Sequence, residues 1–338
     1  MEPTEPVDVS EKSISELLLS MAKTGFQGRK LGEAFKIWLK MLEEERITIL
    51  MGLAGAMVPA GMRKIIAWLI RNRYIDVLVS TGANLFHDIH EAMGFKHYLG
   101  SECVNDYHLF KKGINRIHNV FAYDEEFNRV DYTLADITSE LDGVMSSRQF
   151  LEEIAKRIDV KDRNSIIISA YESGVPIFCP AIADSSIGIA AALADRRVII
   201  DTIRDVEELT ELVASSEKTG VIYIGGGVPK NFIQQTEVVA RLKGYNVKGH
   251  EYAIQITTDT PQFGGLSGCT FEEGISWGKI SHGGRKVQVN VDATIALPLL
   301  AHGLIGTKRR SCPVFVWGRK LRVDYVTQGY EISAYQRF

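Results

Sequence analysis

The sequence has no uninterrupted apolar run long enough to cross a bilayer, and its first residues lack the basic stretch that opens a signal peptide. It also lacks an excess of charge of either sign, since its formal net charge is −3 at pH 7. The overall charge therefore attracts neither nucleic acid nor an anionic membrane surface. These absences predict a cytoplasmic protein with no nucleic-acid partner and no membrane partner.

Cysteine is scarce, and neither cysteine nor histidine shows metal-ligand spacing. The four cysteines lie far apart without a C-x-x-C pair, and no histidines stand at zinc-finger spacing. A G-x-S-x-G motif, which would indicate a serine nucleophile, is also missing. We therefore predict no metal site and four free thiols in the core, at Cys103, Cys179, Cys269 and Cys312.

The chain is long enough for one large α/β domain with a further segment attached. It has 338 residues, of which 45% are hydrophobic and 24% charged, as in an ordinary globular protein. Residues 1–12 contain few apolar side chains and predict a mobile tail. The principal domain is expected over 13–309, opening with a helical extension at Ile14–Lys23 and Leu31–Glu45. Residues 310–338 are interpreted as a C-terminal extension.

Short apolar runs alternate with segments of helical period through most of the chain. Strand and helix in alternation, with strands apolar at nearly every position, predict a mostly parallel sheet with helices on both faces. The expected strands are Ile47–Met51, Val77–Thr81, Ser165–Ala170, Val175–Cys179, Val198–Asp201, Val221–Ile224, Tyr252–Thr257 and Val287–Val291, with a C-terminal hairpin of Val314–Trp317 and Leu321–Val326. The expected helices between them are Gly61–Asn72, Phe150–Ile158, Val206–Ser215, Asn231–Leu242 and Ala293–Gly303.

Ligands of such sheets bind beyond the carboxyl ends of the strands. Four expected strands are followed there by Thr81–Asn84, Pro180–Ser186, Gly225–Gly227 and Asp292. The triple glycine, which precedes a helical segment, suits either a bound phosphate or a tight turn.

Two aspartates and two histidines near these strand ends also allow two interpretations each. Asp184 and Asp292 could accept hydrogen bonds from a ribose or cap the helices that follow. His87 and His90 share a helix face and either line a site or pack in the interior.

One further segment carries residues suited to amine chemistry. Thr270 and Glu273 form a capping box, in which the carboxylate reaches back to the helix start, but Glu273 could instead hold an ammonium group. Trp277 lies on the same helix face and offers a cation–π surface. Lys279 would be a nucleophile if buried and an ordinary surface lysine if not. An ideal helix places Lys279 about 200° from Trp277, so spacing alone does not bring them together.

Taken together, these motifs resemble a known family. The run Glu273–Ile280, preceded by Ser267–Gly268 and followed by Val287–Thr294, is similar to the active-site segment of deoxyhypusine synthases. The resemblance extends from Gly25 to Leu304, over nearly the whole chain.

The resemblance implies a Rossmann-like homotetramer with active sites between paired subunits. It implies that NAD takes a hydride from spermidine and that the resulting imine passes its aminobutyl group to Lys279. A lysine of the hypusine-containing translation initiation factor then receives the group. By the same resemblance, Glu273 and Trp277 bind the polyamine. The cofactor-binding positions are Thr81, Asp184, Gly225, Gly227, Thr258, Ser267 and Asp292.

The chain departs from eukaryotic members of that family at several positions, among them Gly55 and Ala56, which lack the polar side chains of those members. Ile189 and Leu266 stand where those members carry acidic residues, and Asn231 stands where they carry a histidine. Two alternatives therefore stay open. One is transfer to a small diamine, as in homospermidine synthesis, or from another donor such as agmatine. The other is a non-catalytic NAD-binding assembly protein.

Overall fold

A computed structural model describes residues 1–327 of the chain. Its centre is a six-stranded sheet in which every neighbouring pair is parallel. The predicted α/β architecture is therefore confirmed. The strand order is β11 (Ile280–Asn290), β10 (His250–Thr257), β9 (Lys218–Ile224), β1 (Ile47–Leu53), β2 (Val77–Ser80) and β7 (Ile177–Phe178).

Strand β1 lies in the middle of the sheet because its residues are apolar on both sides. All seven of its residues are buried, and it pairs with β9 on one side and β2 on the other. Ile49 and Met51 belong to one hydrophobic core, whereas Leu50 between them belongs to the other. A continuous apolar strand buried on both faces is typical of a parallel sheet.

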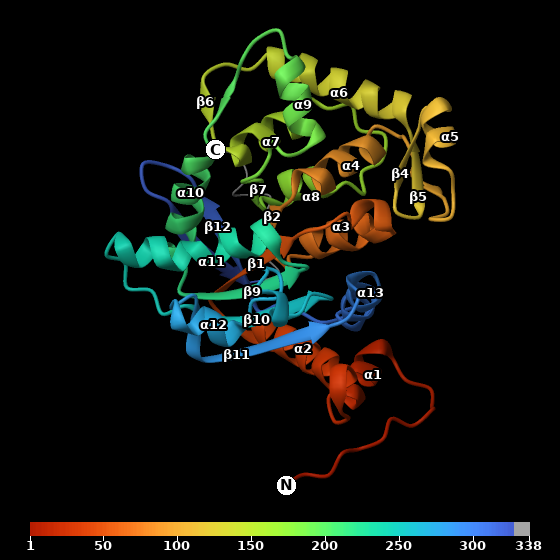
Figure 1. Cartoon of the computed structure of the whole chain (residues 1–338). Coiled ribbons are helices and arrows are strands. Elements are labelled where there is room, and N and C mark those ends of the chain that lie inside the picture. Colours follow the sequence, from red (N-terminus) through yellow and green to blue (C-terminus); the bar gives the residue numbers. More distant parts are fainter. Residues whose placement is uncertain (328–338) are drawn as a thin grey trace.

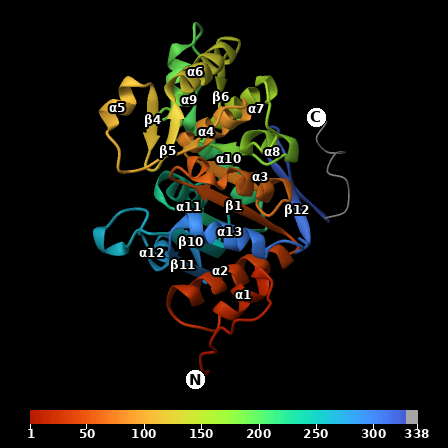
Figure 2. The same cartoon turned by 90° about the vertical axis from the view of Figure 1, so that its right-hand side faces the viewer.

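Helices cover both faces of the sheet, as the alternating pattern predicts (Figure 1). On one face α2 (Phe26–Glu43) and α13 (Ala293–Gly303) pack on β10, with α3 (Arg63–Arg71) beside α13. On the other face α11 (Gly227–Leu242) packs on β1 and β2, α12 (Phe271–Ser276) packs on β11, and α10 (Thr202–Ser215) covers α11. The expected N-terminal helical extension corresponds to α1 (Ile14–Met21) and α2. Helix α1 packs on α2 and α13 below the sheet (Figures 1 and 2).

The middle of the chain forms a second layer above the sheet (Figures 1 and 2). Its small strands pair outside the central sheet: β3 (Tyr98–Leu99), β4 (Ile114–Ile117) and β5 (Val120–Tyr123) with one another, and β6 (Val144–Met145) with β8 (Ile199–Ile200). Its helices are α4 (Gly82–Ala92), α5 (Asp106–Lys111), α6 (Asp124–Ser139), α7 (Ser147–Arg157), α8 (Ile166–Ser173) and α9 (Ser186–Leu193).

Two predicted strands are corrected here. Ser165–Ala170 is not a strand, because Ile166–Ser173 forms helix α8, and the Ser165 hydroxyl caps that helix by accepting from the Ile168 amide at 3.2 Å. A run of isoleucines that is buried on all sides shows the same sequence pattern in a strand and in a helix. Val198–Asp201 does contain a strand, but only Ile199–Ile200, and it lies outside the central sheet.

The predicted C-terminal hairpin is confirmed and lies beside β1. It consists of β12 (Ser311–Val316) and β13 (Arg322–Thr327), which pair antiparallel. The remainder of the predicted extension, residues 328–338, lies outside the described residues. Within residues 1–327 no helix has both the length and the apolar composition needed to span a membrane.

All four cysteines are free thiols, as predicted, but only two of them belong to the core. Cys179 and Cys312 are buried, whereas Cys103 is exposed and Cys269 is half-buried. Cys269 follows the loop after β10, so its surroundings belong to the site described next.

Candidate functional site

The glycine turn after β9 requires glycine and is held against the loop after β10. Gly225 has φ 75° and Gly227 has φ 55°, a region that side chains rarely adopt. A Cβ at Gly226 would lie 2.4 Å from the Ser267 Cα atom. The Gly227 amide donates to the Ser267 hydroxyl at 3.0 Å. Two predicted cofactor-binding residues, Gly227 and Ser267, are thus in direct contact.

Thr81 and Asp184 follow neighbouring strands, β2 and β7, at the same edge of the sheet. The Thr81 hydroxyl donates to the Gly55 carbonyl at 3.3 Å and accepts from the Asn84 side chain at 3.0 Å. Asp184 is exposed, and the N-cap position of helix α9 is Ser185, whose side chain makes no capping hydrogen bond. The interpretation of Asp184 as a helix cap is therefore wrong, and its carboxylate stands at the surface of this edge.

Asp292 and Thr258 follow the last two strands of the sheet. Asp292 caps α13 by accepting from the Thr294 amide at 2.7 Å and the Thr294 hydroxyl at 2.6 Å. These bonds hold the pKa of the exposed Asp292 carboxyl below its usual value. Thr258 is exposed directly after β10. All seven predicted cofactor positions therefore lie beyond the carboxyl ends of strands.

The capping box predicted at Thr270 and Glu273 is only half formed. The Thr270 hydroxyl accepts from the Glu273 amide at 3.1 Å, but across the described residues the Glu273 carboxylate makes no return bond to the Thr270 amide. Glu273 is exposed. Its carboxylate is therefore available to a cationic ligand, and the predicted reach back to the helix start is wrong.

Lys279 and Trp277 are brought together because helix α12 ends at Ser276 and the chain turns between the two residues. Trp277 is the C-cap residue of the helix, and the chain turns at Gly278, where φ is 66°. The Lys279 amide then donates back to the Gly274 carbonyl at 2.9 Å. This turn places the partly buried Lys279 Nζ 5.2 Å from the centre of the Trp277 ring. The turn at Gly278, and not helical spacing, therefore places Lys279 beside Trp277.

Lys279 lies before a strand, unlike the predicted cofactor residues. Its carbonyl accepts from the His250 amide, which opens β10, at 3.1 Å. Asp292 follows the other end of β11. The predicted cofactor positions are therefore polar or glycine residues that follow strands, whereas Lys279 does not and is indicated only by the motif around it.

Sequence reasoning missed a buried lysine beside this segment. Lys230 in α11 is fully buried, and burial lowers its pKa to about 8. Its Nζ donates to the Gln255 side chain at 2.8 Å and to the Cys269 carbonyl at 2.6 Å. Gln255 stands between two isoleucines and Gln288 between two valines, and an amide in the middle of such an apolar run was the signal available in the sequence.

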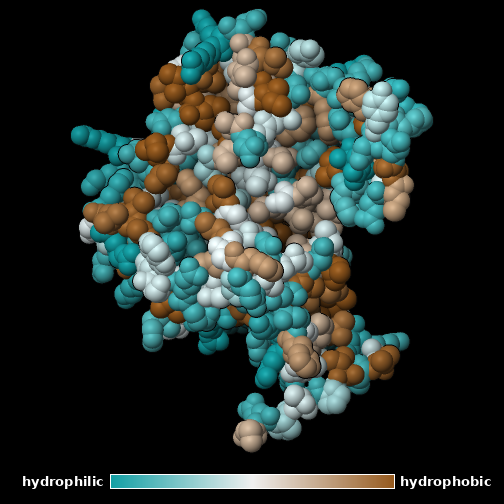
Figure 3. All heavy atoms as spheres, in the orientation of Figure 1, coloured by the Kyte–Doolittle hydropathy of each residue, from teal (hydrophilic) through white to brown (hydrophobic). Residues whose placement is uncertain are grey.

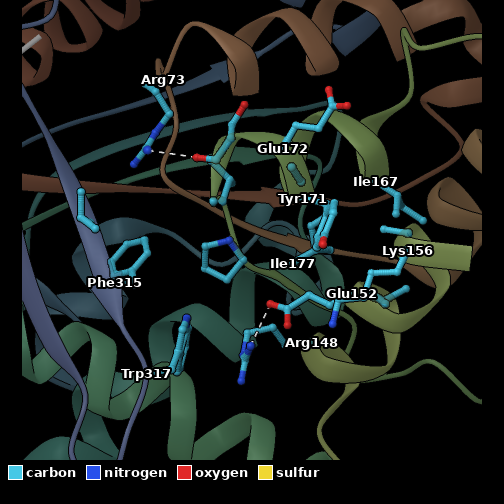
Figure 4. Close-up of a pocket in the computed structure, with 18 residues that line it drawn as sticks. Arg73, Arg148, Glu152, Lys156, Ile167, Tyr171, Glu172, Ile177, Phe315 and Trp317 are labelled. Atoms are coloured by element: carbon cyan, nitrogen blue, oxygen red, sulfur yellow. Dashed lines mark hydrogen bonds and ion pairs between the residues drawn. The ribbon is translucent and has the colours of Figure 1, made fainter. Parts of the chain in front are cut away.

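A separate pocket lies at the amino end of β7 (Figure 4). It measures about 610 Å³ and is lined by α7, α8 and the C-terminal hairpin. Its Arg148 stacks on the Trp317 ring at 3.8 Å and is paired with Glu152 at 2.8 Å and Glu208 at 2.7 Å. This pocket contains none of the predicted site residues.

Comparison with known proteins agrees with the geometry. The family model described as deoxyhypusine synthase matches residues 16–304. A protein of Archaeoglobus fulgidus called "Probable deoxyhypusine synthase 2" is 81% identical over 295 residues, covering 87% of this chain and 99% of that protein. Its namesake in Methanosarcina acetivorans is 54% identical over 334 residues, covering 96% of this chain and 97% of that protein.

The fold also matches a solved structure. A crystal structure described as "a putative deoxyhypusine synthase from Entamoeba histolytica" aligns with a TM-score of 0.60 at 20% identity, covering 88% of this chain and 95% of that one. At this identity the match supports the fold alone. With the family model and the closely similar archaeal proteins, the conclusion is that the chain belongs to the deoxyhypusine synthase family.

Proposed function

We propose that this protein transfers the aminobutyl group of spermidine, through an imine at Lys279, to a lysine of the hypusine-containing translation initiation factor, with NAD as cofactor. One observation carries the proposal. The Lys279 amine lies 5.2 Å from the Trp277 ring centre, in the segment that also presents the exposed Glu273 carboxylate. A nucleophilic amine, an aromatic face and a carboxylate are the groups that a polyamine reaction requires.

The carboxyl edge of the sheet fits a dinucleotide. The glycine turn lets a phosphate approach the start of α11, where the positive end of the helix favours an anion. The exposed carboxylates of Asp184 and Asp292 could accept from ribose hydroxyls. When bound, NAD would accept a hydride from the amine donor and return it at the end of the reaction.

The chain's own residues would then bind the donor and carry the transferred group. Glu273 would pair with an ammonium group of the polyamine, and Trp277 would cover its cationic chain. The Lys279 amine would attack the imine carbon of the oxidised donor, and the remaining diamine would leave as the new carbon–nitrogen double bond forms. The acceptor lysine would displace Lys279 in the same way, and the lysine amine would be regenerated.

We also propose a cytoplasmic homotetramer with sites between paired subunits. Four apolar side chains of the upper layer are each more than half exposed, and Figure 3 shows apolar surface gathered there. Apolar exposure of this kind supports burial against another subunit. The side chains are Val144, Ile189, Leu193 and Ile199.

Trapping with borohydride tests the proposal. The protein is incubated with NAD and spermidine, reduced, digested and mapped by mass spectrometry. We expect an aminobutyl adduct on Lys279, its loss in Lys279→Ala, and its retention in Lys286→Ala, which changes a partly buried lysine of β11, the strand that follows Lys279. NAD binding should survive in Lys279→Ala. Tight NAD binding by the wild type without any adduct would contradict the proposal and favour a non-catalytic NAD-binding protein.

The acceptor is identified by a second step. Purified translation factor or putrescine is added to the protein, NAD and spermidine before reduction, and the product that carries the aminobutyl group is identified. We expect the factor to receive the group. Transfer to putrescine alone would instead assign a homospermidine-type reaction. The apolar side chains of Ile189 and Leu266, 54% and 46% exposed, carry no negative charge to bind an ammonium group, which favours a different amine.

A further inference from the structure

The ammonium group of Lys230 lies in surroundings that disfavour its positive charge. Its side chain is fully buried in the first turn of α11, where the helix dipole is positive. Burial is the main cause that lowers its pKa to about 8, and the charge of Lys279 lowers it further, whereas Cys269 and Glu273 act in the opposite direction. Its two hydrogen-bond acceptors are neutral oxygens. A buried cation so weakly compensated costs stability.

The oxygens that Lys230 contacts do not need it. The Gln288 side-chain amide donates to the same Gln255 oxygen at 2.7 Å and to the same Cys269 carbonyl at 3.0 Å. If Lys230 were replaced by an apolar side chain, both acceptors would keep a partner. The ammonium is therefore dispensable to the fold, and a reason for its presence must be sought in the site.

The hydrogen bonds around Lys230 join the two halves of the candidate site. The Gln255 amide donates to the Gly225 carbonyl at 2.9 Å and to the Ser267 carbonyl at 2.7 Å. Lys230 itself holds the Cys269 carbonyl, two residues before Phe271 opens α12, and its Nζ lies 5.7 Å from the Phe271 ring centre. The glycine turn and the segment that leads to Lys279 are thus fixed to one buried point.

We infer that Lys230 is a positioning residue that fixes α12 and so holds the Lys279 amine at the reacting carbon. The inference rests on the proposed function. The ammonium donates to both the Gln255 side-chain oxygen and the Cys269 carbonyl before α12. It restrains that carbonyl more firmly than an amide alone, because charge-assisted hydrogen bonds are shorter and stronger. A small displacement of a reacting group slows the chemical step and leaves substrate binding nearly unchanged, so we expect the loss of Lys230 to lower kcat.

The variant Lys230→Met tests the inference, because methionine fills a similar volume without charge. We expect the rate of adduct formation at Lys279 to fall about ten-fold or more at saturating spermidine, with the KM for spermidine changed less than about three-fold. The thermal midpoint should stay the same or rise, because the buried charge is gone. A purely structural role would instead lower the midpoint in parallel with the activity, and that result would overturn the inference.

Gln288→Met is the matched control, since it removes the redundant amide and leaves the ammonium in place. We expect it to retain more of the adduct rate than Lys230→Met does. An equal or larger loss in Gln288→Met would show that packing of the network matters and the ammonium does not, which would also overturn the inference.

A labelling experiment separates this inference from the proposed function. Formaldehyde and borohydride methylate accessible amines without donor or cofactor, and mass spectrometry compares Lys279 with Lys286 in the same sample. We expect Lys230→Met to change the labelling rate of Lys279 relative to Lys286 by about five-fold or more, because the segment that positions Lys279 is no longer held by the ammonium group. If the wild type forms no spermidine adduct, the proposed function fails, yet this comparison still stands. Unchanged labelling would overturn the role of Lys230.

Discussion

A single glycine sets the position of the candidate nucleophile. Gly278 has φ 66°, and a Cβ there would lie 2.0 Å from Nη1 of Arg241. Arg241 also donates through Nη2 to the Trp277 carbonyl at 2.6 Å. The chain can therefore leave α12 and enter β11 within one residue, and the lysine that follows is directed over the tryptophan ring rather than along the helix.

Gly278→Ala should therefore weaken both the fold and the reaction. The left-handed backbone costs a residue with a Cβ about 1–2 kcal/mol, and Arg241 must move away from its bond to Trp277. We expect a loss of that size in urea unfolding together with slower adduct formation at Lys279. Gly265→Ala is the control, because no atom lies within 4 Å of a Cβ there and its φ is not positive. Equal stability of the two variants would contradict the argument.

At this scale the sequence predicts residues better than it predicts contacts. Glu273, Trp277 and Lys279 are contiguous enough to be recognised as a motif, although their meeting depends on where the helix ends. Lys230 could not be predicted in the same way. A lysine is usually solvated, and its burial follows from the packing of α11 and the loop after β10, which no local pattern encodes.

At the scale of elements, the long buried strands were the most predictable. β1, β9 and β10 are seven or eight residues long, are buried along nearly their whole length and stand between helices of clear period. The upper layer was largely missed because its strands are two to four residues long. Short pairs of this kind depend on neighbouring elements for their burial and leave little periodicity to read.

The histidines on α4 make the upper layer sensitive to acid. His87 Nδ1 lies 3.0 Å from His97 Nε2, and His90 Nε2 lies 3.2 Å from a carboxylate oxygen of Glu126 on α6. Burial lowers the pKa of His87 and of His90 from 6.5 to about 3, helped in both by the charge of His97 and in His90 by that of Arg63. These histidines therefore pack in the interior, between α4 and α6.

We expect the free energy of unfolding to fall as the pH drops from 6.5 toward 3. The unfolded chain binds protons at these histidines in that range while the folded chain does not, so acid favours unfolding. His90→Leu should reduce the difference between urea midpoints measured at pH 7 and pH 5. The exposed His282 offers a control, because His282→Leu removes a histidine that is not buried. A pH dependence as steep in His90→Leu as in the wild type would count against the assignment.

At the scale of the whole molecule, one buried carboxylate ties the C-terminal hairpin to the sheet. Asp76 accepts from the Ile49 amide at 2.8 Å and from both terminal nitrogens of Arg309 at 2.6 and 2.7 Å. Arg73 pairs with Asp76 at 3.1 Å and also donates to the Pro313 carbonyl of β12 at 2.7 Å. The three charged side chains are almost completely buried.

Asp76→Asn should be among the most destabilising single changes in this chain. It removes the carboxylate that pairs with the buried guanidinium groups of Arg73 and Arg309. Removing one partner of a buried ion pair costs about 3–5 kcal/mol. Asp324→Asn in the C-terminal hairpin is the control. Asp324 is 43% exposed, and its ion pair with Arg322 should contribute less than about 1 kcal/mol to the free energy of unfolding. Urea unfolding of both variants measures the difference.

The location of the pair also predicts what Asp76→Asn should spare. Asp76 precedes β2, whereas the predicted cofactor positions follow the strands. Below its unfolding transition the variant should therefore form the Lys279 adduct at close to the wild-type rate. A loss of adduct without a loss of stability would mean that the hairpin acts on the site itself rather than on the fold.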